Sequence, residues 1–176
     1  MKILGVDPGL TRCGFGLIDA GTLTAIEFGL FSSQAGTDPR DRVGSIAEHL
    51  ETLVLNSKPD VIALERVFAQ ANLRSVMGVA QISGALMHIA YENKIPLQFF
   101  TPSEVKAAVT GNGRATKEQV SMMVKRLLKL QELSGPADVA DALAVAITAS
   151  KRGGAGGTTA QQKWVAAAKA ANRRIG

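Results

Sequence analysis

Two acidic residues, Asp7 and Glu65, each follow directly after a short apolar run of the sequence, residues 3–6 and 61–64. Both runs have the length of a buried strand, and functional groups collect at the carboxyl ends of parallel strands in an open sheet. If the two strands are parallel neighbours, both carboxylates therefore emerge at the same edge of the sheet. Carboxylate oxygens are the ligands that Mg²⁺ and Mn²⁺ take in proteins, so the pair is a candidate for metal-assisted chemistry.

A second pair of acids, Asp138 and Asp141, lies three residues apart in an otherwise apolar segment, which predicts a helix over residues 137–151. A helix that is apolar almost all round packs against a sheet, where an ionised carboxylate is costly unless it is paired or bound to a metal. Two such carboxylates on one face also repel each other, and a divalent cation would relieve both costs. The predicted catalytic and metal-binding residues are therefore Asp7, Glu65, Asp138 and Asp141.

Each acid also has a purely structural interpretation. Asp7 stands in an Asp-Pro-Gly turn sequence, and Glu65 can pair with Arg66 or mark the end of its strand. Asp138 fits the first turn of a helix, where the helix dipole favours an acid. Asp141 lies in the second turn of an apolar helix and is the hardest of the four to explain in this way. Two acids at strand ends together with a helical pair support a metal site better than any single residue does.

The remaining pattern predicts the elements that must position these acids. Strands are expected at residues 3–6, 14–18, 23–31, 61–64 and 96–100, and helices at residues 40–55, 73–92, 103–109, 116–130 and 137–151. Ser103 is the expected cap of the third helix, and Thr116 opens the fourth with a capping-box pattern. The first three strands follow one another through tight turns, which predicts an antiparallel meander. The order of elements predicts an α/β fold, a mixed sheet with helices on its faces.

Length and composition favour one folded domain with a polyanionic partner. The chain has 176 residues and is 46% hydrophobic, and its net charge of +5 with a sequence pI of about 9.6 suits nucleic acid or an acidic membrane surface. The one cysteine, Cys13, excludes an intrachain disulfide and a cysteine metal cluster, and it favours the cytoplasm. The N-terminal apolar run is too short for a signal peptide, and no stretch reaches the roughly 20 apolar residues of a spanning helix. We therefore expect a soluble protein that does not enter the membrane.

The last part of the chain differs in composition from the rest. Residues 153–157 are mostly Gly, and the sequence beyond them is rich in Ala, Lys and Arg, with Trp164 as its one large aromatic residue. This predicts a folded domain over residues 1–151, followed over residues 152–176 by a Gly-rich linker and a basic, flexible tail.

Four segments of the sequence resemble motifs of the RuvC family of Holliday-junction resolvases. They follow in the family's order and spacing over residues 1–150 and read ILGVDPGLTRCGFG, ALERVF, TGNGRATKEQV and ADVADALAVAIT. The resemblance implies a ribonuclease H-like α/β fold, a five-stranded mixed sheet whose first three strands are antiparallel, flanked by helices. The family's four acidic positions fall on the four acids named above, and none of them is substituted.

The resemblance also implies an activity, a cofactor and partners. Members are metal-dependent endodeoxyribonucleases that resolve four-way (Holliday) DNA junctions by paired symmetric nicks in recombination and DNA repair. Two Mg²⁺ ions per active site, for which Mn²⁺ would substitute, would activate the attacking water and stabilise the departing 3′ oxygen, leaving 5′-phosphate and 3′-hydroxyl ends. Asp7 is the expected bridging ligand. A homodimer and a branch-migration helicase complex are the protein partners that the family implies.

The expected DNA contacts lie near the acids in the sequence. Phe68 stands three residues beyond Glu65, where an aromatic side chain of the family can stack on an unpaired base, although a place in the core is the simpler interpretation. Lys106 and Lys117 match basic family positions that hold phosphate, and solvated lysines on helices are the ordinary alternative. Further candidates for phosphate contacts are Arg12, Arg66, Arg74 and Arg114.

The helix predicted over residues 73–92 is the candidate dimer interface. It carries a wider set of small and apolar residues than one core-facing stripe requires, and an isologous dimer would present two equal sites to a nearly symmetric junction. The set is Met77, Gly78, Ala80, Gln81, Gly84 and Met87. The alternative is that both stripes belong to the core.

Three other functions stay open at this point. A sugar kinase or actin-like ATPase shares the fold and the opening strand, but its two lobes need a longer chain. A non-catalytic junction-binding protein would explain the basic charge and Phe68, but it gives no reason for Asp138 and Asp141. A related nuclease that acts on RNA or on other branched nucleic acid differs only in its substrate, so only a comparison of substrates separates it from the resolvases.

Overall fold

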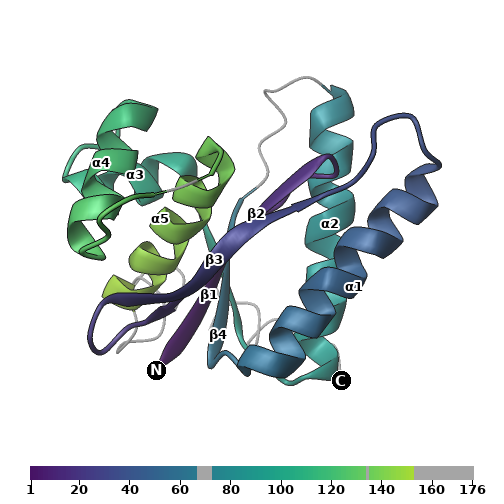
Figure 1. Cartoon of the computed structure of the whole chain (residues 1–176), viewed down its shortest axis with the longest axis horizontal. Helices are drawn as coiled ribbons and strands as arrows, with labels where there is room; N and C mark the ends of the chain where they lie inside the picture. Colours follow the sequence, from purple (N-terminus) through teal and green to yellow (C-terminus); the bar gives the residue numbers. More distant parts are fainter. Residues whose placement is uncertain (67–72, 134, 153–176) are drawn as a thin grey trace, which may run out of the picture.

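The computed structural model describes residues 1–66, 73–133 and 135–152, and within them the chain forms five strands and five helices (Figure 1). The strands are β1 (Lys2–Asp7), β2 (Arg12–Asp19), β3 (Thr24–Ser32), β4 (Val61–Glu65) and β5 (Leu97–Phe100). The helices are α1 (Pro39–Ser57), α2 (Leu73–Glu92), α3 (Pro102–Thr110), α4 (Lys117–Leu127) and α5 (Ala137–Arg152). Every predicted strand and helix is therefore present, and only the end of α4 differs by more than two residues from its expected place.

The sheet has the strand order β3-β2-β1-β4-β5. Strands β1 to β3 form an antiparallel meander, whereas β4 lies parallel beside β1 and β5 parallel beside β4. In the register of β1 and β4, Val6 stands opposite Leu64, so the next residues, Asp7 and Glu65, end two neighbouring parallel strands at the same edge. The mixed sheet is confirmed, and so is the parallel pairing on which the meeting of the two acids depended.

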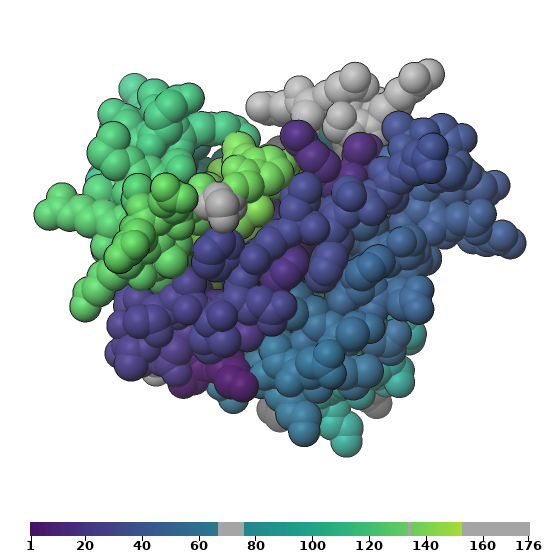
Figure 2. All heavy atoms as spheres, in the orientation of Figure 1, coloured from purple at the N-terminus to yellow at the C-terminus, as the bar shows by residue number. Residues whose placement is uncertain are grey.

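Helices cover both faces of the sheet. Helices α1 and α2 lie on one face, and α5 lies on the other with α3 and α4 beside it (Figure 1). The side chains of β1 alternate between two cores: Ile3 shares the α5 core with Leu143, and Leu4 shares the opposite core with Leu50 of α1. In the space-filling view, α4 and α5 (green) and α1 (blue) flank the hairpin of β2 and β3 (Figure 2). The first strand is therefore buried on both faces, as its apolar sequence requires.

Helix α5 lies directly on β1 and β2 because two glycines leave room for its backbone. A methyl group on Gly5 would overlap the backbone carbonyl of Ala142, and one on Gly14 would overlap the backbone carbonyl of Asp138. Contacts this close are possible only where no Cβ stands between strand and helix. They hold the N-terminal turns of α5, and the acids on them, against the carboxyl end of β1.

The third helix is capped by Thr101, so the prediction of Ser103 as its cap is wrong. The Thr101 hydroxyl accepts the N–H of Glu104 at 3.2 Å, and the Glu104 carboxylate accepts the N–H of Thr101 at 2.7 Å. Pro102 takes the first helical position, where its missing N–H would have had no partner in any case. The reciprocal capping box therefore places the cap two residues before the predicted one.

The fourth helix is capped by Thr116, as predicted, and Gln119 completes its capping box. It ends at Leu127 and not near residue 130, because Lys129 takes a left-handed backbone conformation with a φ of 53°. The apolar period of the sequence continues past this point, which is why the pattern predicted a longer helix.

The outer face of α2 is largely the predicted one. Its exposed members are Met77, Ala80, Gln81, Gly84 and Met87. Gly78 is buried instead, and a methyl group on it would lie 2.9 Å from Cβ of Leu10, in the turn between β1 and β2. Gly78 therefore serves the packing of α2 within the fold, and its assignment to the dimer face is corrected.

Across the described ranges, no helix is both long and apolar enough to cross a membrane. The linker and tail predicted from the composition lie outside the described residues beyond Arg152, so the division at residue 151 stays a prediction.

Candidate active site

The structure brings the four acids to one edge of the sheet. Asp7 and Glu65 end β1 and β4, and Asp138 and Asp141 lie in the first two turns of α5. Asp7 stands opposite Gly14 in the register of β1 and β2, and Gly14 is the residue against which the Asp138 backbone rests. The strand pair and the helix pair therefore meet above the carboxyl end of β1.

Burial and like charges dominate the electrostatics of the strand acids. Burial raises the pKa of Asp7 most, and the charges of the other three acids raise it further, from 3.8 to about 7. Burial, and then the charge of Asp141, also raises the pKa of Glu65, against the opposing charges of Lys117 and Lys106. The site therefore holds more negative charge than its own basic residues balance.

Each helix acid faces a basic side chain. Lys117 Nζ lies 3.0 Å from Asp141 Oδ2 and donates a hydrogen bond that raises the pKa of Lys117. Arg12 Nε lies 3.2 Å from Asp138 Oδ2 but makes no hydrogen bond to it, and this buried oxygen has no hydrogen-bond partner in the described residues. Within the same residues, no ion pair reaches the two strand acids.

The donor set suits a divalent cation in kind. Carboxylate oxygens are the ligands that Mg²⁺ and Mn²⁺ prefer, and a cation would relieve both the unsatisfied oxygen of Asp138 and the crowded charge around Asp7. In residues 1–66, 73–133 and 135–152, no three His, Cys, Asp or Glu side chains lie close enough together to hold one ion. Convergence on an ion therefore requires side-chain movement, and Asp138 and Asp141 are the acids that basic partners now hold.

Three of the predicted DNA contacts lie beside these acids. Lys106 is half-buried on α3 and lowers the pKa of Glu65 by its charge. Lys117 is the first residue of α4, and Arg12 is the first residue of β2. Although β2 is distant from α3 and α4 in the sequence, the three elements place these three positive charges around one group of carboxylates.

The other predicted contacts are less closely tied to the site. Arg66 is exposed just beyond β4, and Arg114 is exposed in the loop before α4. Phe68 lies outside the described residues, and so does the side chain of Arg74 at the start of α2. Stacking by Phe68 and phosphate binding by Arg74 therefore stay predictions.

The sequence analysis did not predict which basic side chain contacts which acid. Arg12 and Lys117 were expected to meet phosphate, and the structure shows them on Asp138 and Asp141. The signal that could have found them is the charge balance of a buried acidic cluster, which calls for cations close by.

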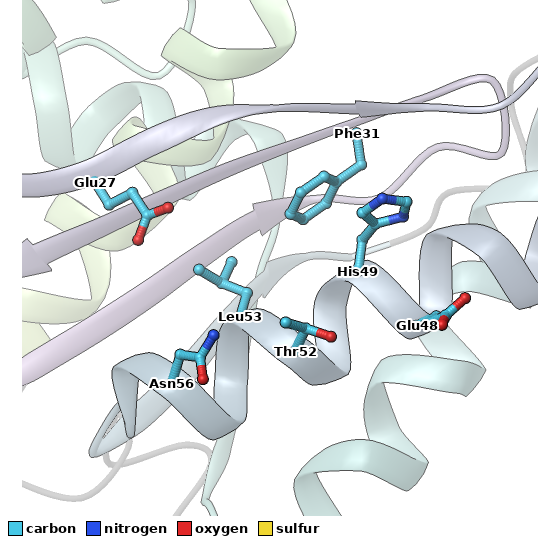
Figure 3. Close-up of a pocket in the computed structure, with 7 residues that line it drawn as sticks. All are labelled: Glu27, Phe31, Glu48, His49, Thr52, Leu53 and Asn56. Atoms are coloured by element: carbon cyan, nitrogen blue, oxygen red, sulfur yellow. The ribbon is translucent and has the colours of Figure 1, made fainter.

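A separate hollow lies between β3 and α1, with a cavity volume of about 390 Å³ (Figure 3). Its lining residues are Glu27, Phe31, Glu48, His49, Thr52, Leu53 and Asn56. The rings of Phe31 and His49 stack there with their centroids 5.1 Å apart. None of the four acids lines this hollow, so it is distinct from the acidic edge of the sheet.

Comparison with known proteins assigns the family. A family model described as "Crossover junction endodeoxyribonuclease RuvC" matches residues 3–149. The chain belongs to the RuvC family. A RuvC protein from Frankia alni is 48% identical over 157 residues, which cover 87% of this chain and 79% of that protein. A RuvC protein from Saccharopolyspora erythraea is 45% identical, over 99% of this chain and 89% of that protein.

A solved structure from the family shares the fold. The structure of Thermus thermophilus RuvC in complex with a Holliday junction substrate matches with a TM-score of 0.78 and 32% identity, over 84% of this chain and 92% of that one. The ribonuclease H-like fold and the family indicated by the sequence motifs are both confirmed.

Proposed function

We propose that this chain is a metal-dependent endodeoxyribonuclease that resolves four-way DNA junctions, with four catalytic metal ligands: Asp7, Glu65, Asp138 and Asp141. The observation that carries the proposal is the meeting of four carboxylates from β1, β4 and α5 at one edge of the sheet, in a chain of the RuvC family. The relatives at 48% and 45% identity are named crossover junction endodeoxyribonucleases, and the matching Thermus structure contains a Holliday junction substrate. Membership of this family also argues against the alternative of a sugar kinase or actin-like ATPase.

Asp7 is the centre of the proposed metal site. Burial and three like charges oppose its ionised form, so it would gain most from a bound cation and would be the central residue that holds the metal. Glu65 supports the site from the neighbouring strand, and the two helix acids complete it from above. When bound, Mg²⁺ or Mn²⁺ would neutralise charge on the phosphodiester, activate the attacking water and stabilise the departing 3′ oxygen.

The basic side chains around the acids are the proposed phosphate contacts. Lys106 and Lys117 put positive charge next to the carboxylates, where the scissile phosphate has to approach. Arg66 and Arg114, both exposed, would extend this track along the DNA backbone. Stacking of Phe68 on a base at the junction centre is part of the same proposal.

A comparison of substrates tests the function directly. A mobile four-way DNA junction and a linear duplex of the same sequence are incubated with the full chain, with Mg²⁺ or with EDTA. We expect paired nicks in the junction that need Mg²⁺ and that DNA ligase can seal, and little cutting of the duplex. Equal cutting of junction and duplex would contradict junction selectivity, and junction binding without any cutting would favour the non-catalytic alternative. An RNA junction of the same shape tests the RNA nuclease alternative.

A homodimer built on the outer face of α2 fits this substrate. A two-fold symmetric junction has two equivalent cutting points, and an isologous dimer offers two equal sites. Met77 and Met87 are 55% and 48% exposed on that face, and such a dimer would bury both side chains. A branch-migration helicase complex and a cytoplasmic location stay the expected partner and setting.

The dimer is tested by replacing both methionines. Met77→Glu with Met87→Glu is expected to convert a dimer into a monomer in sedimentation experiments, because the charges would be buried in the interface. Met122→Glu is the matched control, since Met122 is 68% exposed on α4. A wild-type chain that sediments as a monomer at high concentration would overturn this part of the proposal.

A further inference from the structure

Arg12 approaches one of the four acids at an oxygen that a metal ion would also need. Its Nε lies 3.2 Å from Asp138 Oδ2, an oxygen that is buried and accepts no hydrogen bond in the described residues. The side chain of Arg12 is 58% exposed, whereas that of Asp138 is 21% exposed. The guanidinium therefore meets a shielded carboxylate from the solvent side, where DNA has to arrive.

The backbone around Arg12 fixes this arrangement. A methyl group on Gly9 would overlap the backbone carbonyl of Arg12, so the turn between β1 and β2 folds closely on itself. The same turn connects Asp7, at the end of β1, to Arg12, at the start of β2. Two residues further along β2, Gly14 supports the backbone of Asp138. Arg12 and the acids are thus placed by one short stretch of chain.

The two base–acid contacts at the site differ in quality. Lys117 donates a hydrogen bond to Asp141 at 3.0 Å, whereas Arg12 and Asp138 form an ion pair without a hydrogen bond. Both basic side chains are mostly exposed, so the missing hydrogen bond is what makes the contact of Arg12 the weaker of the two. The contact of Arg12 is therefore the one that a competing cation would displace with less loss.

We propose that Arg12 is a positioning residue that competes with the divalent cation for Asp138 and that passes to a DNA phosphate when the cation binds. This inference rests on the proposed function, because it takes the four acids as the metal site. Metal binding frees the guanidinium for DNA, and a phosphate that holds the guanidinium frees the carboxylate for the metal. By linkage, metal and junction then raise each other's affinity by the same factor.

A calorimetric titration of the full chain with Mn²⁺, in the absence of DNA, tests the competition. Arg12→Gln is expected to bind Mn²⁺ about tenfold more tightly than the wild type, because it removes the competitor. Arg12→Lys keeps the charge and is expected to stay within about twofold of the wild type. Arg40→Gln is the matched control, since Arg40 pairs with Asp41 at 2.8 Å on the exposed start of α1. Equal Mn²⁺ affinities for Arg12→Gln and Arg40→Gln would overturn the proposal.

The same substitution made in the variant Asp138→Asn separates direct competition for Asp138 from a general effect of charge. If Arg12 acts through Asp138, adding Arg12→Gln to Asp138→Asn gives no further gain in Mn²⁺ affinity. The same gain in both backgrounds would show a general field effect and would overturn the proposal. Junction binding gives an independent readout: exchanging EDTA for Ca²⁺ should strengthen wild-type binding, and Arg12→Gln should lose most of that gain. An undiminished gain in Arg12→Gln would also overturn it.

The variant Asp7→Asn separates this inference from the proposed function. If Asp7→Asn binds Mn²⁺ as tightly as the wild type, the acids are not the metal site, and the proposed function fails with the inference. If Asp7→Asn binds weakly while Arg12→Gln behaves like Arg40→Gln, only the competition by Arg12 fails.

Discussion

The strand acids and the helix acids meet in one site, but their surroundings are opposite. Asp7 and Glu65 end buried strands, have no ion pair within the described residues, and have pKa values that burial and like charges raise. Asp138 and Asp141 stand on a helix that packs on those strands, and each faces a basic side chain from another element. Within the described residues, the strand half of the site therefore has no ion pair, whereas each acid of the helix half has one.

The difference shows how a protein can hold four carboxylates together. Sheet pairing fixes the backbones of Asp7 and Glu65, so the two strand ends cannot move apart to relieve the repulsion. The helix acids are held by side-chain contacts, which can be exchanged for a metal ion without disturbing the fold. A half without ion pairs and a half with exchangeable ion pairs together make a site that is stable and still ready for a cation.

The largest expected effect is the loss of cleavage when an acid in either half of the site is replaced. Asp7→Asn and Asp141→Asn are each expected to slow cleavage of a four-way junction in Mg²⁺ by about a thousandfold or more, equivalent to about 4 kcal/mol of barrier, because a metal ligand is lost. Junction affinity should change little. Asp41→Asn, an exposed acid on α1, is the control and should cut normally. Normal cutting by either active-site variant would contradict its assignment as a ligand.

The next effect separates the two halves through stability and pH. The pKa of Asp7 is about 7 in the folded protein and about 3.8 when unfolded, so the folded state binds more protons between these values. Stability is therefore greatest below pH 4 for this group and falls by up to about 4 kcal/mol as the pH rises to 7. Asp7→Asn removes this fall, so at pH 8 in EDTA it should be more stable than the wild type.

The helix acid provides the contrast. Asp141→Asn breaks the bond with Lys117, which is mostly exposed, and is expected to be neutral or destabilising by less than about 1 kcal/mol at pH 8. Urea unfolding of the three proteins at pH 4.5 and pH 8 measures both effects. If Asp141→Asn stabilised the protein as much as Asp7→Asn does, the two halves would not differ in the way described.

A smaller effect concerns the contact that joins the halves. Gly14→Ala should destabilise the protein by about 2 kcal/mol and slow cleavage, because the added methyl group pushes the Asp138 backbone away from β2. Gly44→Ala is the matched control: Gly44 lies within α1 with no atom near its missing Cβ, so alanine should stabilise by about 0.5–1 kcal/mol. Equal unfolding midpoints for Gly14→Ala and the wild type would show that α5 does not depend on this contact.

The smallest expected effect is a change in the salt dependence of junction binding when lysines around the acids are replaced. Lys106→Ala together with Lys117→Ala should flatten the slope of log K against log[salt] for junction binding by about 0.9 for each lost phosphate contact. Lys125→Ala, an exposed lysine on α4, is the control and should leave the slope unchanged. An unchanged slope in the double variant would remove both lysines from the phosphate track.

Local patterns were enough to predict most of the fold and the four acids. Apolar runs ended by Asp7 and Glu65 have the length of strands, and the segment with Asp138 and Asp141 is apolar almost all round, as a helix packed on a sheet requires. The cap of α3 was misplaced because Ser103 and Thr101 are both good caps. The choice depends on the reciprocal bonds of Thr101 with Glu104, which are visible only in three dimensions.

The contacts that balance the site could not be read from local patterns. The pair of Arg12 and Asp138 depends on how closely α5 approaches Gly14, and the bond from Lys117 to Asp141 depends on where α4 packs. Side-chain partners between segments that are far apart in the sequence follow from tertiary packing. The family resemblance supplied the order of the acids but not their basic partners.

We propose that the four acids hold the metal, and the position of a bound ion tests this directly. Crystals of the full chain with Mn²⁺ would locate the ion by anomalous scattering at the manganese absorption edge. We expect one or two peaks at the edge of the sheet, within direct coordination distance of an oxygen of Asp7 and of oxygens of other members of the four. Ordered Mn²⁺ elsewhere, for example between Glu27 and Glu48, with none beside Asp7, would contradict the account.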